Sequence, residues 1–196
     1  MYVDENGLRL QKEADRIIRN NTAYIISAAQ EFGVNPSILA ATIYAEQRLN
    51  VDWKDDVTDT IGGFYGINTS IGVAQVRMST AKNLENLDYM PKILAKDGGW
   101  NIPGIGFVHG TETMARAKAL ENPAISIMYA TADLAYIQDI WREAYLEIDG
   151  RAAIMATLYN IGEYGANGPH SKPQSTYFGD FAKENYYYMQ KLLGLN

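Results

Sequence analysis

Apolar side chains recur at three- and four-residue intervals along most of this chain, and that helical periodicity limits the folds it can adopt. Patterns that alternate apolar and polar residues, as strands do, are scarce. The first amphipathic helix is marked by Leu10, Ala14, Ile17 and Ile18. A second is expected over residues 22–32, because Gly33 is a natural left-handed stop. The sequence therefore predicts a mainly α fold.

Two Asn-Pro pairs give the clearest helix starts, since an asparagine caps the free amides and proline suits the first helical turn. Asn35-Pro36 opens a helix that reaches Glu46, and Asn122-Pro123 opens a longer one that passes Trp141. Further helices are expected over residues 79–87, 111–120 and 151–159, the last as the buried centre, and around Phe181, Tyr188 and Leu192. Residues 50–69, 97–110 and 163–175 are expected to be loops.

Composition excludes several classes of protein. The 196 residues suit one domain, 1–196, and their 47% hydrophobic content is that of an ordinary globular chain. A net charge of -6 offers no basic surface for nucleic acid. The chain has no cysteine and no transmembrane run, and Met1–Asn20 is too polar for a signal peptide. His109 and His170 stand apart in loops, so no metal site is expected.

Glu46 is the most informative single residue. It follows Leu39 and Ile43 at the spacing of one buried helical face. Burial and the negative end of the helix dipole both raise the pKa of a carboxyl group there. A carboxylic acid that stays protonated near neutral pH is what cleavage of a glycosidic bond requires. The alternative is a structural glutamate at the rim of the stripe that turns to solvent or pairs with Arg48.

Two further fragments carry polar groups that suit a sugar. Ser70-Ile71-Gly72-Val73-Ala74-Gln75 combines a glycine, which permits close backbone approach, with a glutamine that both donates and accepts. Thr80-Ala81 follows it. Later, Thr157-Leu158-Tyr159-Asn160-Ile161-Gly162 ends a buried helix with a phenol and an amide. Each fragment alone is weak, because such residues also serve as helix caps and turns.

The order and spacing of four segments resemble the lytic transglycosylase-like domain of the lysozyme superfamily. The segments are the Glu46 helix, Ser70–Gln75 with Thr80-Ala81, the Asn122-Pro123 helix and the Tyr159-Asn160 helix end. The resemblance covers about residues 25–193, including Glu184-Asn185-Tyr186-Tyr187-Tyr188-Met189 near the end. It implies a lysozyme-like helical domain with long loop insertions, in which Glu46 is the catalytic acid and base. Gln75, Tyr159 and Asn160 would bind substrate or orient Glu46, and the backbone of Ser70 and Gly72 would line the cleft.

The resemblance also implies the reaction. Its leading form is a peptidoglycan lytic transglycosylase that cleaves the β-1,4 bond between N-acetylmuramic acid and N-acetylglucosamine and leaves 1,6-anhydro-muramic acid ends. Such an enzyme acts on the cell wall, whether periplasmic, extracellular or phage-delivered, and is expected to be a monomer without a cofactor. Goose-type lysozymes, the hydrolytic relatives, carry additional aspartates, and the corresponding positions here are Gly66 and Arg77. Their absence favours the route that needs a single carboxylate.

Three departures keep alternatives open. Gln47 replaces the serine that follows the acid, Val73-Ala74 replaces Leu-Met, and an acidic stretch follows the helix, with Asp52, Asp55, Asp56 and Asp59. Asp56 or Asp59 could position a water and give a goose-type muramidase. Gln47 would also suit a non-catalytic glycan-binding module of the same fold, and an unrelated helical protein is a third possibility. Tyr65 and Trp100 are candidate sugar-stacking residues in the loops.

Overall fold

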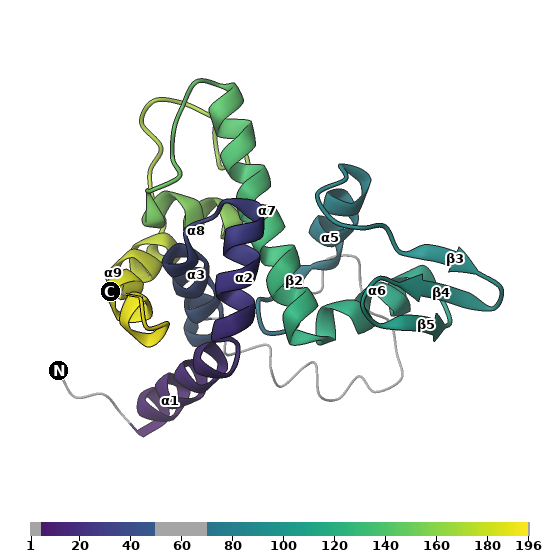
Figure 1. Ribbon diagram of the computed structural model, residues 1–196. Coiled ribbons are helices and arrows are strands. Elements are labelled where there is room, and N and C mark those ends of the chain that lie inside the picture. Colours follow the sequence, from purple (N-terminus) through teal and green to yellow (C-terminus); the bar gives the residue numbers. More distant parts are fainter. Residues whose placement is uncertain (1–4, 50–69, 196) are drawn as a thin grey trace.

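The computed structural model describes residues 5–49 and 70–195, and within these ranges it is mainly α, as the sequence predicts for a lysozyme-like helical domain (Figure 1). The helices are α1 (Glu5–Asn20), α2 (Thr22–Phe32), α3 (Pro36–Leu49), α5 (Met78–Asn86), α6 (Glu112–Glu121), α7 (Pro123–Glu143), α8 (Ala152–Ile161) and α9 (Tyr177–Leu192). The strands are β1 (Ser70–Ile71), β2 (Val76–Arg77), β3 (Leu94–Lys96), β4 (Gly99–Ile102) and β5 (Gly106–His109). None of the helices described combines the length and apolarity needed to cross a bilayer.

The helix boundaries follow the predicted start and stop signals. Gly33 ends α2 in the left-handed conformation, with φ of 68°. The side-chain Oδ1 of Asn35 accepts hydrogen bonds from the backbone amides of Ser37 at 2.9 Å and Ile38 at 3.3 Å. Asn122 caps α7 in the same way. Both Asn-Pro pairs therefore act as the sequence predicts.

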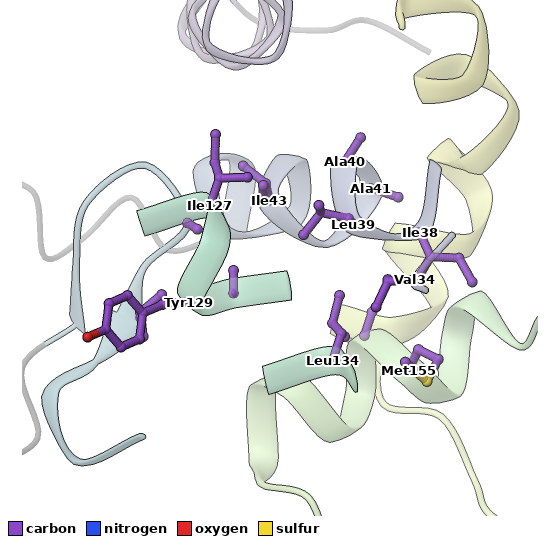
Figure 2. Packing of buried hydrophobic residues seen from close by; sticks show 14 of the residues in the cluster. Val34, Ile38, Leu39, Ala40, Ala41, Ile43, Ile127, Tyr129, Leu134 and Met155 are labelled. Atoms are coloured by element: carbon purple, nitrogen blue, oxygen red, sulfur yellow. The ribbon is translucent and has the colours of Figure 1, made fainter. Parts of the chain in front are cut away.

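Helix α3 is the centre of the molecule. Every residue from Ser37 to Gln47 is buried, and α1, α2, α7, α8 and α9 all pack against this helix. Figure 2 shows Leu39 and Ile43 of α3 in the same cluster as Leu134 of α7 and Met155 of α8. The prediction that residues 151–159 form the central helix was therefore wrong. Helix α8 is largely buried, but α3 is enclosed on all sides.

A second correction follows from this burial. Glu46 does not lie on one apolar stripe, because all faces of α3 around it are buried. Thr42 and Gln47 are polar residues of α3 that are buried, and both form hydrogen bonds inside the protein. The hydroxyl of Thr42, for example, donates to the Ile38 carbonyl oxygen at 2.9 Å. A polar residue on this helix is therefore no guide to an exposed face.

Residues 97–110 are not a loop, as the sequence analysis expected. Strands β3, β4 and β5 form an antiparallel three-stranded sheet in that order, with Ala95 opposite Trp100 and Trp100 opposite Val108. Trp100 is half-buried against a small apolar cluster centred on Ile93 and Ile102. Because each strand has only three or four residues, the alternation that identifies a strand has no length in which to appear.

A buried ionic network joins the helices nearest this sheet. Arg116 of α6 donates two hydrogen bonds to the carboxylate of Glu85 on α5, at 2.8 and 2.7 Å, and one to Glu112 at 2.7 Å. The hydroxyl of Tyr129 on α7 donates to the same Glu85 at 2.8 Å. Arg116 and Glu85 have side chains only 4% exposed. The network therefore fixes α5, α6 and α7 to one another.

Helices α8 and α9 approach each other so closely at Gly179 that no side chain fits between them there. A Cβ at this position would overlap the carbonyl oxygen of Ala153 and the hydroxyl oxygen of Thr157. Helix α9 also packs along α3, so Gly179 sets the distance of the last helix from the central one.

Several sequence predictions fall on residues 50–69, outside the described part of the chain. They are the expected ordered loop itself, the acidic residues Asp52, Asp55, Asp56 and Asp59, the aromatic candidate Tyr65, and the comparison position Gly66.

Candidate active site

One polar pocket brings together most of the residues that the sequence analysis selected. Its lining, as far as the chain is described, consists of Glu46, Ser70, Gln75, Val76, Arg77, Thr80, Asp133, Tyr159 and Asn160. These residues come from α3, the β1–β2 hairpin, α5, α7 and α8. Five of the six predicted site residues meet here. The pocket has a volume of about 50 Å³, which suits a few water molecules or a reacting group rather than a whole sugar ring.

Glu46 enters the pocket from the last turn of α3. Its residue exposure is 5%, so it belongs to the buried interior rather than to a solvated rim. Burial first, and then the proximity of the Glu46 carboxyl group, raise the pKa of the Tyr159 phenol. A carboxyl in this setting has a defined neighbour and limited access to water, as the sequence analysis expected of a general acid.

The β1–β2 hairpin is held in place by three helices. From α3, the amide nitrogen of Gln47 donates to the Val73 carbonyl oxygen at 2.8 Å. From α8, the hydroxyl of Tyr159 donates to the Ala74 carbonyl oxygen at 2.7 Å, while the backbone amide of Ala74 donates to Ser126 Oγ of α7 at 3.2 Å. Gln47, a departure from the expected serine, therefore ties α3 to the hairpin beside it.

Gly72 serves the turn rather than the pocket lining. Its φ is +79°, and an added Cβ would overlap the carbonyl oxygen of Leu120 and contact Ser126 Oγ at 2.5 Å. The glycine therefore lets the hairpin pack onto the α6–α7 junction. Ser70, by contrast, lies on β1 and lines the pocket directly.

Gln75 combines an unusual backbone with an unused acceptor. Its φ of 56° is left-handed, a conformation uncommon for a residue with a side chain. Its side-chain nitrogen donates to the Gly72 carbonyl oxygen at 2.8 Å, which fixes the amide. Its Oε1 is buried and accepts no hydrogen bond from the residues that the structure describes. Gln75 also lines the pocket, so its side chain is a candidate to bind a polar group that arrives there.

Tyr159 and Asn160, at the end of α8, contribute to the lining of the pocket. Burial, then the charges of Glu46 and Asp133, raise the pKa of Tyr159 well above its usual value, so the phenol keeps its proton and remains a donor. Asn160 lines the pocket, and its backbone carbonyl oxygen accepts a hydrogen bond from Arg77 at 2.8 Å. Arg77 therefore spans from β2 to the end of α8.

Asp133 is the pocket residue that the sequence analysis missed. It lies in the middle of α7 and is 8% exposed. Burial and the negative charge of Glu163 raise the pKa of Asp133 from 3.8 to about 8, against the opposing effect of Arg77. The signal that could have found it is the one that identified Glu46: a carboxylate inside an apolar helical run. The pocket thus holds two buried carboxyl groups beside one phenol.

A larger groove of about 830 Å³ lies elsewhere, between residues 150–154 and α9. It is more open and contains none of the predicted site residues. We therefore take the smaller pocket as the candidate site, because it contains two buried carboxyl groups and five of the six predicted residues.

The family comparison covers the first part of this region. Residues 15–98 match the family model described as "T6SS, Peptidoglycan muramidase Tse3, catalytic domain". The matched range contains Glu46, Ser70, Gln75 and Arg77, and ends before α7 and α8. No curated protein and no solved structure matches the chain.

Proposed function

We propose that this protein is a peptidoglycan-cleaving glycosidase of the muramidase type, which breaks the β-1,4 bond after N-acetylmuramic acid with Glu46 as the general acid. The observation that carries the proposal is the pocket that joins Glu46 to Gln75, Tyr159 and Asn160. The similarity of residues 15–98 to the muramidase family model supports the same substrate. The protein's place of action would be the cell wall.

The chemistry assigns each group a task. The carboxylic acid of Glu46 gives its proton to the bridging oxygen as the bond to the anomeric carbon breaks. Because the pocket is too small for a sugar, the glycan would lie across its mouth and present only the reacting bond. Gln75 Oε1 would accept a hydrogen bond from an N–H or O–H group there. Tyr159 and Gln47 would hold the hairpin that forms one wall.

The product distinguishes the two routes that the sequence left open. Attack by water gives a reducing N-acetylmuramic acid end, whereas attack by the muramoyl 6-hydroxyl gives a 1,6-anhydro end. The lytic transglycosylase reading needs one carboxylate and stays a prediction. We favour the hydrolytic route, since the matched family is described as a muramidase and the pocket contains a second carboxyl group.

The test is digestion of purified sacculi, with the released muropeptides identified by mass. We expect soluble fragments from the wild-type protein and a loss of at least about 100-fold in rate for Glu46→Gln, as removal of a general acid typically causes. Glu184→Gln, on the surface of α9, is the control and should digest at the wild-type rate. Binding of the wild-type protein to sacculi without release of fragments would instead identify a non-catalytic module.

A further inference from the structure

The second carboxyl group of the pocket is assigned no role by the resemblance or by the family description. Asp133 and Glu46 come from different helices, and both line the same cavity. The charge of each also acts on the phenol of Tyr159, which lies in the same lining. Most glycosidases use a pair of carboxyl groups, and in the hydrolytic route that inverts the anomeric carbon one acts as the acid and the other as the base.

We propose that Asp133 is the general base of the reaction, which positions the attacking water and takes its proton, so that the enzyme hydrolyses the glycosidic bond. This inference rests on the proposed function and adds the residue that decides between hydrolysis and internal transglycosylation.

The cavity is suited to a water molecule. Its volume of about 50 Å³ exceeds what one water needs, and its walls are rich in polar groups. A buried water is stable when it has two to four polar partners. The residues that line this space include Glu46, Asp133 and Gln75, which carry acceptor oxygens, and Arg77, which carries donors. A water here would therefore be held by the groups that the reaction uses.

The step balances as an ordinary hydrolysis. Glu46 donates its proton to the bridging oxygen, and the bond from that oxygen to the anomeric carbon breaks, with its electron pair remaining on the oxygen. The water oxygen forms the new bond to the anomeric carbon, and its proton passes to the carboxylate of Asp133. Exchange with solvent then returns a proton to Glu46 and removes one from Asp133.

The charges that face Asp133 determine when it can act. Arg77 of β2 favours its ionised form, while Glu163, just after α8, disfavours it. Glu46 of α3 and Tyr159 of α8 are the other titratable groups in the described lining of the pocket. With its pKa near 8, the fraction of Asp133 able to accept a proton rises with pH up to that value. Hydrolysis limited by this group should therefore quicken about tenfold per pH unit below 8.

The first experiment compares Asp133→Asn with the wild type on sacculi. We expect reducing muramic acid ends from the wild type and a loss of about 100-fold or more in rate for the variant. The pH-dependent rise towards 8 should also disappear in the variant. Asp139→Asn is the matched control, because Asp139 is on the same helix but bonds to Tyr89 and Arg142 outside the pocket. It should retain the wild-type rate and pH profile.

A second variant separates a base from a structural residue. In Asp133→Ala, added sodium azide should enter the space left by the carboxylate and attack without a base, which restores cleavage and yields a glycosyl azide. A residue that only supports the fold gives no such product. Failure of azide to restore cleavage, wild-type activity in Asp133→Asn, or anhydro ends from the wild type would each overturn the role of Asp133. A wild-type protein that releases no fragment overturns the proposed function instead.

Discussion

Asp133 shows how a buried carboxyl group can lower the stability of the folded protein. An ionised aspartate is poorly solvated in this interior, so its pKa of about 8 keeps the proton bound in the folded protein, whereas the unfolded chain releases it near 3.8. The free energy of unfolding therefore falls as pH rises between these two values, because only the unfolded chain releases the proton. A tenfold change in proton affinity corresponds to about 1.4 kcal/mol, so the accumulated loss of stability at pH 8 is on the order of several kcal/mol.

Asp133→Asn is accordingly expected to stabilise the protein at high pH. At pH near 4, where the aspartate is protonated in the fold and partly protonated when unfolded, the two proteins should unfold at nearly the same temperature. The gap should widen as pH rises and be largest near pH 8, in favour of the variant. Calorimetry across this range measures it, and a gap that narrows with rising pH would contradict the buried acid.

Glu46 and Asp133 show which residues of the candidate site could be predicted from the sequence. Glu46 was identifiable because it follows Leu39 and Ile43 in an otherwise apolar helix. Asp133 is also a carboxylate inside an apolar helical run, between Ala132 and Leu134. It has no counterpart in the motifs of the resemblance, so the resemblance does not predict it. The role of Gln47 was not predictable, because its bond to Val73 joins α3 to a hairpin whose position depends on the whole fold.

At the scale of elements, helices were predicted well and the sheet was not. Capping side chains such as Asn35 and Asn122 bond to backbone amides only two or three residues away, so a short stretch of sequence predicts where these helices begin. The strands β3 and β4 were missed although Asp97-Gly98 lies between them as a two-residue connection, with Lys96 paired to Gly99. Aspartate followed by glycine is a strong hairpin signal, and it was outweighed by the shortness of the flanking strands.

The contact between α8 and α9 provides a test of packing at this scale. Gly179→Ala should destabilise the protein by about 1–3 kcal/mol, because the new methyl group overlaps Ala153 and Thr157 and the helices must separate. Gly150→Ala is the control: its Cβ meets no atom within 4 Å and its φ is not left-handed. Urea titration should show a lower midpoint for Gly179→Ala and an unchanged or slightly higher one for Gly150→Ala.

At the scale of the whole molecule, the network of Arg116, Glu85 and Tyr129 joins the part that contains the three-stranded sheet to the helical core. In Figure 1, α7 extends from α6 and the sheet to the helices around α3. Arg116 and Glu85 lie at the beginning of that connection, with Tyr129 of α7 bound to the same carboxylate. Because both side chains are buried, removal of Arg116 leaves the carboxylate of Glu85 as a buried charge without its cationic partner.

Arg116→Met should therefore lower the free energy of unfolding by about 3–5 kcal/mol. The double variant Arg116→Met with Glu85→Leu should recover much of this loss, since no charge is left buried. A double-mutant cycle by chemical denaturation measures the coupling between the two residues. As a control, Lys118→Met, in the exposed pair with Glu121, should change the stability by less than about 1 kcal/mol. Equal losses from Arg116→Met and Lys118→Met would contradict a structural role for the network.

The β1–β2 hairpin beside Glu46 depends on the rest of the fold for its position. Strands of two residues, Ser70–Ile71 and Val76–Arg77, have no stability of their own. The bonds that hold their turn come from Gln47, Ser126 and Tyr159, which are distant in the chain and meet only when three helices have docked. The pocket is therefore complete only when α3, α7 and α8 are docked, and the glycan cleavage that we propose would require this docked state.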